Sequence, residues 1–279
     1  MPVNETQREH WNSDEAQHWV TAQEAYDRQL QPFGDAAIDA AAIKVTDRVL
    51  DIGCGCGATT IAAAGRASHA VGVDLSEPML AHARRRAAAL GVDNVEFVAD
   101  DVQIHKFGTA EFDIAVSRFG VMFFDDPTQA FANVRSALRP GGRLTFVCWR
   151  ELAANEWLLV PGLAAAAHVP LPDTGSPGAP GMFALADPDG VTALLEGAGF
   201  EEIMVSPFDT QMLVGGGGTV DETVEYLLST GIGKAMFEGA EPAAAQAGLE
   251  AVKAVLAEHH DGNGVRLGAG TWLVTAHRS

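Results

Sequence analysis

Short apolar runs alternate with amphipathic or alanine-rich stretches in the middle of the chain, from about residue 48 to residue 149. This alternation predicts buried strands at 48–52, 69–75, 94–99, 112–117 and 143–149, and helices at 58–66, 76–91 and 127–138. Ser76 is suited to cap the second helix through its hydroxyl, and Pro78 is tolerated in the first turn. Strands that alternate with helices predict βαβ units, a parallel sheet and helices on both of its faces.

The segments before and after this alternation are predicted to be largely helical. Residues 1–44 form a helical extension with four large aromatic residues, Trp11, Trp19, Tyr26 and Phe33. After a loop rich in Pro and Gly at 170–183, the pattern predicts a helix at 187–198, a strand at 201–209, a flexible joint at 215–218, helices at 221–229 and 241–260, and a last strand at 270–277.

The charge balance narrows the class of partner. Lys and Arg number 18 and Asp and Glu number 37, which gives a net charge of −19. A chain this acidic repels a phosphate backbone, so we expect a small-molecule substrate and no nucleic acid. The polar N-terminus has no secretory signal, and the apolar stretch at 157–169 is too short to span a bilayer and is interrupted by Pro161. With three cysteines, too few for a disulfide scaffold, we expect a cytoplasmic protein.

The most informative segment is the glycine-rich turn after the first predicted strand. Asp51, Gly53, Gly55 and Gly57 satisfy the pattern D-x-G-x-G-x-G, and Asp74 follows 23 residues after Asp51 at the end of the second strand. Glycines let a ligand approach the backbone closely, and a carboxylate at Asp74 can accept from both hydroxyls of a ribose. The turn also satisfies the looser dinucleotide fingerprint, which makes an NAD(P)-dependent oxidoreductase the alternative. Asp51 disfavours that alternative, because its carboxylate would repel a pyrophosphate.

This segment resembles the first motif of class I S-adenosylmethionine-dependent methyltransferases, and the resemblance extends over about residues 45–150. It implies a doubly wound, Rossmann-like α/β fold, whose mostly parallel seven-stranded sheet has helices on both faces and an antiparallel last strand. It also implies that the helices of 1–44 form a lid over the cofactor. Residues 45–279 would then form the methyltransferase domain, with a helical cap insertion at about 215–262.

The same resemblance implies which residues bind S-adenosylmethionine. In the second motif Asp74 binds the ribose, and Leu75 and Met79 flank the adenine. In the third motif an acid, Asp101 or alternatively Asp100, accepts from the adenine amino group. The complete predicted set is Asp51, Gly53, Cys54, Gly55, Asp74, Leu75, Met79, Asp101, Val102, Ser117 and Tyr26. The motifs of DNA-methylating enzymes are absent, which agrees with the charge of the chain.

Methyl transfer from a sulfonium needs mainly proximity, alignment and the exclusion of water, so no catalytic triad is expected. The catalytic residues stay unknown, with Tyr26, His105 and His168 as candidates, although a surface or capped position is the simpler interpretation of both histidines. Candidates for the acceptor pocket are Trp19, Arg118, Phe119 and Met122. Cys54 and Cys56 are spaced C-x-C with no second pair, so no metal site is predicted.

The predicted function is methyl transfer from S-adenosylmethionine, by in-line displacement, to a small organic acceptor such as a natural product or a quinone-like or lipid-like molecule. Two alternatives stay open, the oxidoreductase named above and a protein that binds S-adenosylmethionine without catalysis, because a fold alone does not fix a reaction. The acceptor, its reacting atom and the choice between monomer and homodimer also stay open.

Overall fold

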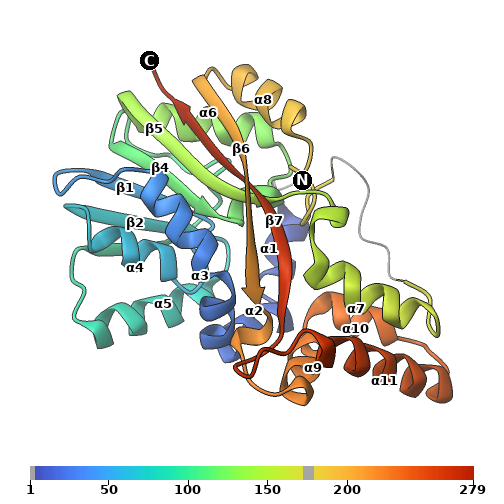
Figure 1. The fold of residues 1–279 in the computed structure, drawn as a ribbon. Helices are drawn as coiled ribbons and strands as arrows, with labels where there is room; N and C mark the ends of the chain where they lie inside the picture. Colours follow the sequence, from blue (N-terminus) through green and yellow to red (C-terminus); the bar gives the residue numbers. More distant parts are fainter. Residues whose placement is uncertain (1–3, 172–178) are drawn as a thin grey trace.

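A computed structural model of the protein describes residues 4–171 and 179–279 (Figure 1). Its centre is a seven-stranded sheet with the order β3-β2-β1-β4-β5-β7-β6. The strands are β1 (Arg48–Ile52), β2 (His69–Asp74), β3 (Val95–Ala99), β4 (Phe112–Arg118), β5 (Leu138–Trp149), β6 (Glu201–Leu213) and β7 (Arg266–His277). Strands β1 to β5 pair in parallel, and β7 pairs antiparallel with β5 and β6. The predicted α/β fold with an antiparallel last strand is confirmed.

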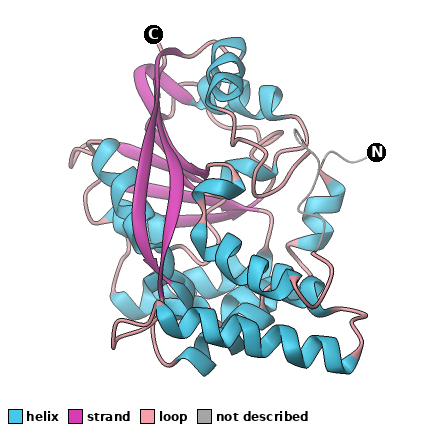
Figure 2. Cartoon of the chain, turned by 45° about the vertical axis from the view of Figure 1, so that its right-hand side comes forward, coloured by secondary structure: helices cyan, strands magenta, loops and turns pink. Residues whose placement is uncertain are grey.

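Helices cover both faces of this sheet (Figure 2). They are α1 (Glu5–His10), α2 (Asp14–Thr21), α3 (Gln23–Ala40), α4 (Ala58–Ala64), α5 (Glu77–Leu90), α6 (Pro127–Ala137), α7 (Glu156–Ala166), α8 (Pro188–Gly197), α9 (Val220–Ser229), α10 (Gly231–Phe237) and α11 (Pro242–Glu258). Val49 and Ile114 share a buried cluster with residues of α3 and α4, whereas their neighbours Leu50 and Ala115 belong to the cluster that contains Phe131 of α6. Successive strand residues point to opposite faces, so both faces are buried.

The strand order places a crevice beside the glycine-rich turn. From β1 the chain moves outward to β2 and β3, and then returns to the other side of β1 as β4. The connections that leave the carboxyl ends of β1 and β4 therefore diverge. In open α/β sheets, ligands bind at such a switch point.

Two groups of helices lie around this end of the sheet. Before β1, α2 packs against α5, and α3 packs against β4 and β5. Between β6 and β7, α9 packs against α10 and α11, and α11 also packs against α7 (Figure 1). Helices thus occupy the predicted lid and the predicted cap insertion, including α10, which the sequence pattern did not predict. The division into lid, domain and insertion stays a prediction.

Some element boundaries differ from those predicted. β5 begins at Leu138 instead of residue 143, and backbone hydrogen bonds of Gly141 and Gly142 to Arg278, at 2.7 and 2.8 Å, hold the segment in line with the last strand. Helix α7 continues through Pro161, where the sequence predicted an interruption. Part of the predicted loop at 170–183 lies outside the described residues.

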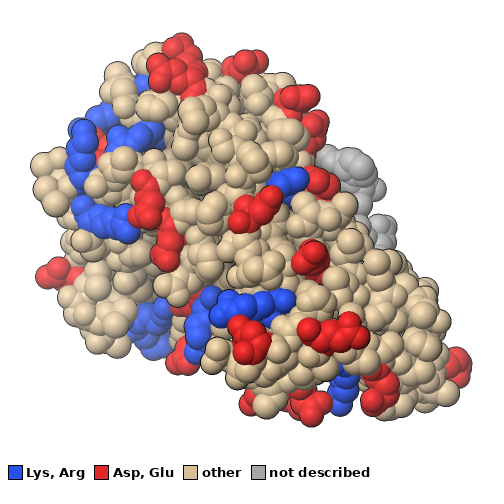
Figure 3. Space-filling model, in the orientation of Figure 1, with Lys and Arg blue, Asp and Glu red and all other residues tan. Residues whose placement is uncertain are grey.

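Charged side chains of opposite sign lie beside one another on the face drawn in Figure 3. Ion pairs of this kind join Arg48 to Glu111 at 3.0 Å and Arg84 to Glu77 at 2.7 Å. Among the described residues, no helix is long and apolar enough to cross a membrane. The expectations of a cytoplasmic location and of no nucleic-acid partner stay predictions.

The four glycines at 215–218 form a defined turn and not the flexible joint predicted. Gln29 of α3 accepts from the Gly215 N–H at 2.7 Å, and Arg28 Nε donates to the Gly216 carbonyl at 2.8 Å. Gly216 has a φ of +75°, and a Cβ at this position would lie 2.8 Å from the carbonyl oxygen of Ala25. The turn is therefore docked on α3, and it fixes the path from β6 to α9.

We expect Gly216→Ala to destabilise the protein more than Gly239→Ala. Both glycines have positive φ, +75° and +70°, so both variants carry a similar conformational cost of about 1–2 kcal/mol. Only at Gly216 does the added methyl group meet backbone atoms, which adds about 1–3 kcal/mol. Urea unfolding followed by circular dichroism gives both free energies of unfolding, and equal losses would contradict the docked turn.

Candidate functional site

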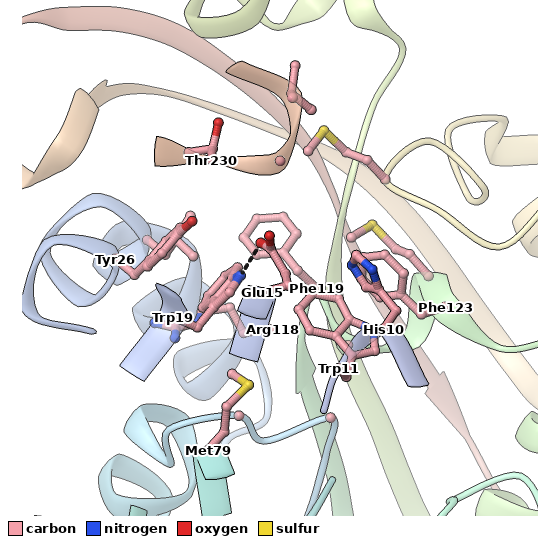
Figure 4. A pocket seen from close by; sticks show the side chains of 18 of the residues that line it. His10, Trp11, Glu15, Trp19, Tyr26, Met79, Arg118, Phe119, Phe123 and Thr230 are labelled. Atoms are coloured by element: carbon pink, nitrogen blue, oxygen red, sulfur yellow. Dashed lines mark hydrogen bonds between the residues drawn. The ribbon is translucent and has the colours of Figure 1, made fainter. Parts of the chain in front are cut away.

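A cavity of about 520 Å³ opens at the carboxyl ends of β1, β2 and β4. The glycine-rich turn forms one side, and residues of α1 to α3, α7 and α9 to α11 form the other. Figure 4 shows aromatic side chains around this space, with Met79 on one side and Thr230 on the opposite side. Apolar residues of the wall include Leu30, Met122, Phe124, Trp149, Trp157, Leu227 and Phe237. The cavity therefore joins a backbone-rich floor to a mainly apolar chamber.

The floor is built by glycines that allow unusually close approach. Gly53 and Gly55 have φ of +64° and +53°. A Cβ at Gly53 would lie 2.7 Å from the Cα of Gly120, and one at Gly55 would lie 2.9 Å from the Cε of Met79. Side chains at these positions would displace the turn or fill the cavity. This explains why the predicted cofactor residues Gly53, Cys54 and Gly55 all line it.

Asp74 holds the glycine-rich turn against the end of β2. Its two carboxylate oxygens accept from the backbone N–H groups of Gly55 at 2.7 Å and Ser76 at 2.8 Å. Burial raises the pKa of Asp74, and these hydrogen bonds oppose that rise. Each oxygen keeps accepting capacity toward the cavity, which suits two neighbouring hydroxyls of a ribose. Leu75 and Met79 line the cavity beside Asp74.

Two buried acceptors lie unpartnered at the third motif. Asp101 Oδ1 accepts from the Gln103 N–H at 2.9 Å, but Asp101 Oδ2 has no hydrogen-bond partner within the described chain. Asn4 Oδ1 is equally unpartnered, and both residues line the cavity with Val102. An exocyclic amino group such as that of adenine offers two N–H donors, so these acceptors fit the predicted cofactor. Asp100 is less suitable, because His105 Nδ1 lies 2.7 Å from its Oδ2.

Asp51 and Ser117 lie beneath the floor and do not line the cavity. The Thr60 hydroxyl donates to Asp51 Oδ2 at 2.6 Å, while burial raises the pKa of Asp51 to about 7. The Ser117 hydroxyl donates to the Ile52 carbonyl at 2.7 Å and accepts from the Gly120 N–H at 3.1 Å. Ser117 thus ties the end of β1 to the end of β4. Both residues were predicted to bind the cofactor, and here they shape the floor from below.

The first helices contribute an aromatic wall. Trp19 and Tyr26 stack with ring centroids 3.7 Å apart, and Trp19 Nε1 donates to Glu15 Oε1 at 3.1 Å (Figure 4). The Tyr26 hydroxyl lies 3.1 Å from His18 Nε2, and burial raises the pKa of Tyr26. Tyr26 is therefore a neutral phenol at ordinary pH. Phe33 is fully buried and stays outside the cavity, as a core residue.

The residues predicted for the acceptor pocket lie together. Trp19, Arg118, Phe119 and Met122 all line the cavity. Phe119 stacks on Trp149 with centroids 4.2 Å apart and has a φ of +65°, which is rare for a residue with a side chain. This backbone conformation turns the chain sharply at the end of β4. It brings the ends of β1 and β4 into contact at the floor.

Two catalytic candidates do not reach the cavity. His105 lies outside the wall beside Asp100, because that carboxylate holds it at 2.7 Å. His168 is exposed at the end of α7, outside the lining. No cluster of His, Cys, Asp or Glu in the described ranges could hold a metal ion.

Sequence reasoning missed several wall residues, among them Asn4, Glu15, Asp27 and Tyr226. Glu15 carried a usable signal, because it precedes Trp19 by four residues and therefore shares its helix face. Tyr226 comes from α9, and its buried hydroxyl has no hydrogen-bond partner in the described ranges. Nothing local in the sequence shows which face of α9 meets the cavity.

Residues 49–142 match the model of a protein family described as a methyltransferase domain. This part of the chain is a methyltransferase domain, as the motifs from Asp51 to Asp101 predicted. This match supports the predicted family over this range, and S-adenosylmethionine is the cofactor that the family implies. The matched range runs from β1 through the glycine-rich turn to the start of β5.

Two of the relatives are bacterial methyltransferases. Aklanonic acid methyltransferase DauC from Streptomyces sp. (strain C5) is 32% identical over 118 residues, which are 41% of this chain and 54% of that protein. Demethylmenaquinone methyltransferase from Clavibacter sepedonicus is 37% identical over 98 residues, 35% of this chain and 39% of that protein. The match thus spans about half, or less, of these relatives.

Solved structures share the fold over most of the chain. The YcgJ protein from Bacillus subtilis has a TM-score of 0.56 at 18% identity, with 89% of this chain and 98% of that chain covered. The [4+2]-cyclase SpnF has a TM-score of 0.55 at 20% identity, with 88% and 79% covered. At this identity the similarity concerns the fold alone.

We expect Asp74→Ala to weaken binding of S-adenosylhomocysteine by roughly 10- to 100-fold, the loss of one or two charge-assisted hydrogen bonds. Asp93→Ala, an exposed carboxylate after α5, is the matched control and should bind normally. Isothermal titration calorimetry measures both dissociation constants. An unchanged constant for Asp74→Ala would contradict the place given to the ribose.

We expect Asp51→Asn to change how stability depends on pH without added ligand. The folded-state pKa of Asp51 is about 7 and its ordinary value is 3.8. Between these values the folded protein holds a proton that the unfolded chain has lost, so rising pH lowers the free energy of unfolding. That loss, up to about 1.4 kcal/mol per pH unit, ends above pH 7. Urea unfolding at pH 5, 6, 7 and 8 should show wild type losing stability relative to Asp51→Asn up to pH 7, and parallel curves would contradict this.

Proposed function

We propose that this protein transfers a methyl group from S-adenosylmethionine to a small, mainly apolar acceptor. The observation that carries the proposal is the single cavity that runs from the glycine-rich floor to the aromatic and aliphatic chamber under α9 to α11. A cofactor on the floor and an acceptor in the chamber would share one enclosed space. Such enclosure is the main requirement for an in-line displacement.

Residues on the floor would hold the cofactor. Asp74 would accept from the ribose, and the free acceptors of Asp101 and Asn4 would meet the adenine amino group. When bound, S-adenosylmethionine supplies a methyl group on an activated sulfonium. Asp74, together with Asp51 above its pKa of about 7, gives this region the negative charge that favours a cationic ligand over a pyrophosphate. An NAD(P)-dependent oxidoreductase is therefore disfavoured.

The lining of the chamber favours a planar acceptor. The aromatic side chains of Trp19, Tyr26 and Phe119 border the space, and flat apolar molecules pack well against aromatic rings (Figure 4). Two relatives are named for methylating aklanonic acid and demethylmenaquinone, an acid and a quinone. Both names agree with a small organic acceptor for this chain.

The lid and cap would contribute by excluding water and orienting the acceptor. Trp19 is held by Glu15 and stacked on Tyr26, so contacts within the chain already assemble the aromatic wall. Tyr26 keeps its proton at ordinary pH, which makes it a poor base and a suitable hydrogen-bond donor. The rate enhancement would thus come from proximity and desolvation, without a dedicated base.

Mass spectrometry with trideuteromethyl-labelled S-adenosylmethionine tests the proposal. We expect S-adenosylhomocysteine to form together with a trideuteromethylated product from a panel of planar phenols, quinols and aromatic carboxylic acids. Asp93→Ala should retain this turnover, and Asp74→Ala should lose most of it. Binding of S-adenosylhomocysteine without transfer to any acceptor, including those in a cell extract, would instead indicate a non-catalytic binding protein.

A further inference from the structure

Arg118, at the end of β4, carries a buried charge with unused donors. Its side chain is 14% exposed and lines the cavity (Figure 4). A guanidinium has five N–H donors, yet none of those of Arg118 makes a hydrogen bond within the part of the chain that the structure describes. The nearest carboxylate oxygen, Asp27 Oδ1, lies 3.7 Å from its Nη2, beyond hydrogen-bond distance.

The neighbouring Arg86, in contrast, uses its N–H donors in hydrogen bonds within the protein. Arg86 donates to Asp27 Oδ2 and to the Cys56 carbonyl, both at 2.6 Å. Gln23 Nε2 donates to the same oxygen of Asp27. Both of these hydrogen bonds use Asp27 Oδ2, so Asp27 Oδ1 offers Arg118 only the ion pair at 3.7 Å, without a hydrogen bond. Arg118 is left to face the cavity.

The residues around Arg118 leave space for its side chain, and this arrangement costs free energy in three ways. Burial lowers the pKa of Arg118, which reflects the expense of keeping its charge away from water. Gly34, in the middle of α3, stands where a Cβ would lie 3.3 Å from Arg118 Cδ. Glycine weakens a helix interior, so its presence here favours space for the arginine over helix stability. Phe119, the next residue, holds a strained positive φ of +65°.

We propose that Arg118 binds a carboxylate inside the cavity, through parallel N–H donors of its guanidinium. The planar guanidinium matches a carboxylate in shape, and pairs of this kind are strong when water is excluded. Asp27 and Asp51 lie near enough to influence Arg118, so the local charge suits a single negative charge better than a multiply charged phosphate. This inference rests on the proposed function.

Two molecules in the proposed reaction could supply that carboxylate. One is the amino-acid end of the cofactor, because Gly120, two residues after Arg118, touches the glycine-rich floor at Gly53. The other is an acidic acceptor in the chamber. A role limited to neutralising Asp27 and Asp51 would make Arg118 matter for stability but not for the choice between charged and uncharged ligands.

Calorimetry with two cofactor analogues tests the first source. S-adenosylhomocysteine carries the carboxylate, and decarboxylated S-adenosylhomocysteine lacks it but keeps the ammonium. We expect Arg118→Met to weaken S-adenosylhomocysteine roughly 10- to 100-fold and to leave the decarboxylated analogue as tight or tighter. Arg118→Lys should fall between wild type and Arg118→Met, and Arg66→Met, which removes an exposed arginine paired with Asp39, should behave as wild type.

A second pair of probes tests the acceptor as the source. With S-adenosylhomocysteine saturating, 2-naphthoate should bind wild type more tightly than 2-naphthamide, and Arg118→Met should abolish that preference. Loss of carboxylate preference in either pair supports the inference and identifies the source. If Arg118→Met and Arg118→Lys fold and keep both preferences unchanged, or if wild type shows neither preference, the inference is overturned. If wild type binds no cofactor analogue, the proposed function fails, and the naphthoate and naphthamide titrations repeated without S-adenosylhomocysteine still test the carboxylate preference of Arg118.

Discussion

Backbone contact between Gly53 and Gly120 brings the ends of β1 and β4 together, and the cavity depends on it. A Cβ on Gly120 would lie 2.5 Å from the Ile52 carbonyl oxygen, so neither strand end can move apart or carry a side chain without reshaping the floor. The Ser117 hydroxyl bridges the same two ends with two hydrogen bonds. Because the loops leaving β1 and β4 diverge from this point, the space above it becomes the ligand site. The glycines at 53 and 120 and the position of the cavity floor thus follow from this one contact, at a switch point that the strand order creates.

The charged residues of the site are also grouped around this floor. Asp51, Asp74 and Asp101 lie under or around the floor, and Arg118 lies beside them with its donors unused. The three carboxylates of the protein suit a ligand that carries hydroxyl, amino and cationic groups. The guanidinium of Arg118 suits one carboxylate on that ligand. S-adenosylmethionine has that combination, whereas a dinucleotide would bring a pyrophosphate toward the acids. The apolar chamber beyond the floor has few charges, so an acceptor there would be desolvated as it binds.

The sequence predicted those features that local motifs encode. The turn from Asp51 to Gly57, Asp74 and the acid at Asp101 could be found because each lies at a fixed place after a strand. Features set by tertiary packing could not be found this way. The face of α9 that presents Tyr226 depends on how the turn at 215–218 docks on α3, and nothing near Tyr226 in the chain reports that docking. The contact of His105 with Asp100, which places the imidazole outside the cavity lining, likewise depends on tertiary packing.

Thermal unfolding with S-adenosylhomocysteine and with NADH, measured in parallel, tests the cofactor assignment most directly. A ligand at 100 times its dissociation constant adds about 2.7 kcal/mol to the free energy of unfolding, which raises the midpoint of a protein this size by several degrees. We expect that rise with S-adenosylhomocysteine and no rise with NADH. A rise with NADH alone would contradict the assignment, since it would mean that the floor accepts a pyrophosphate beside the carboxylates of Asp51 and Asp101.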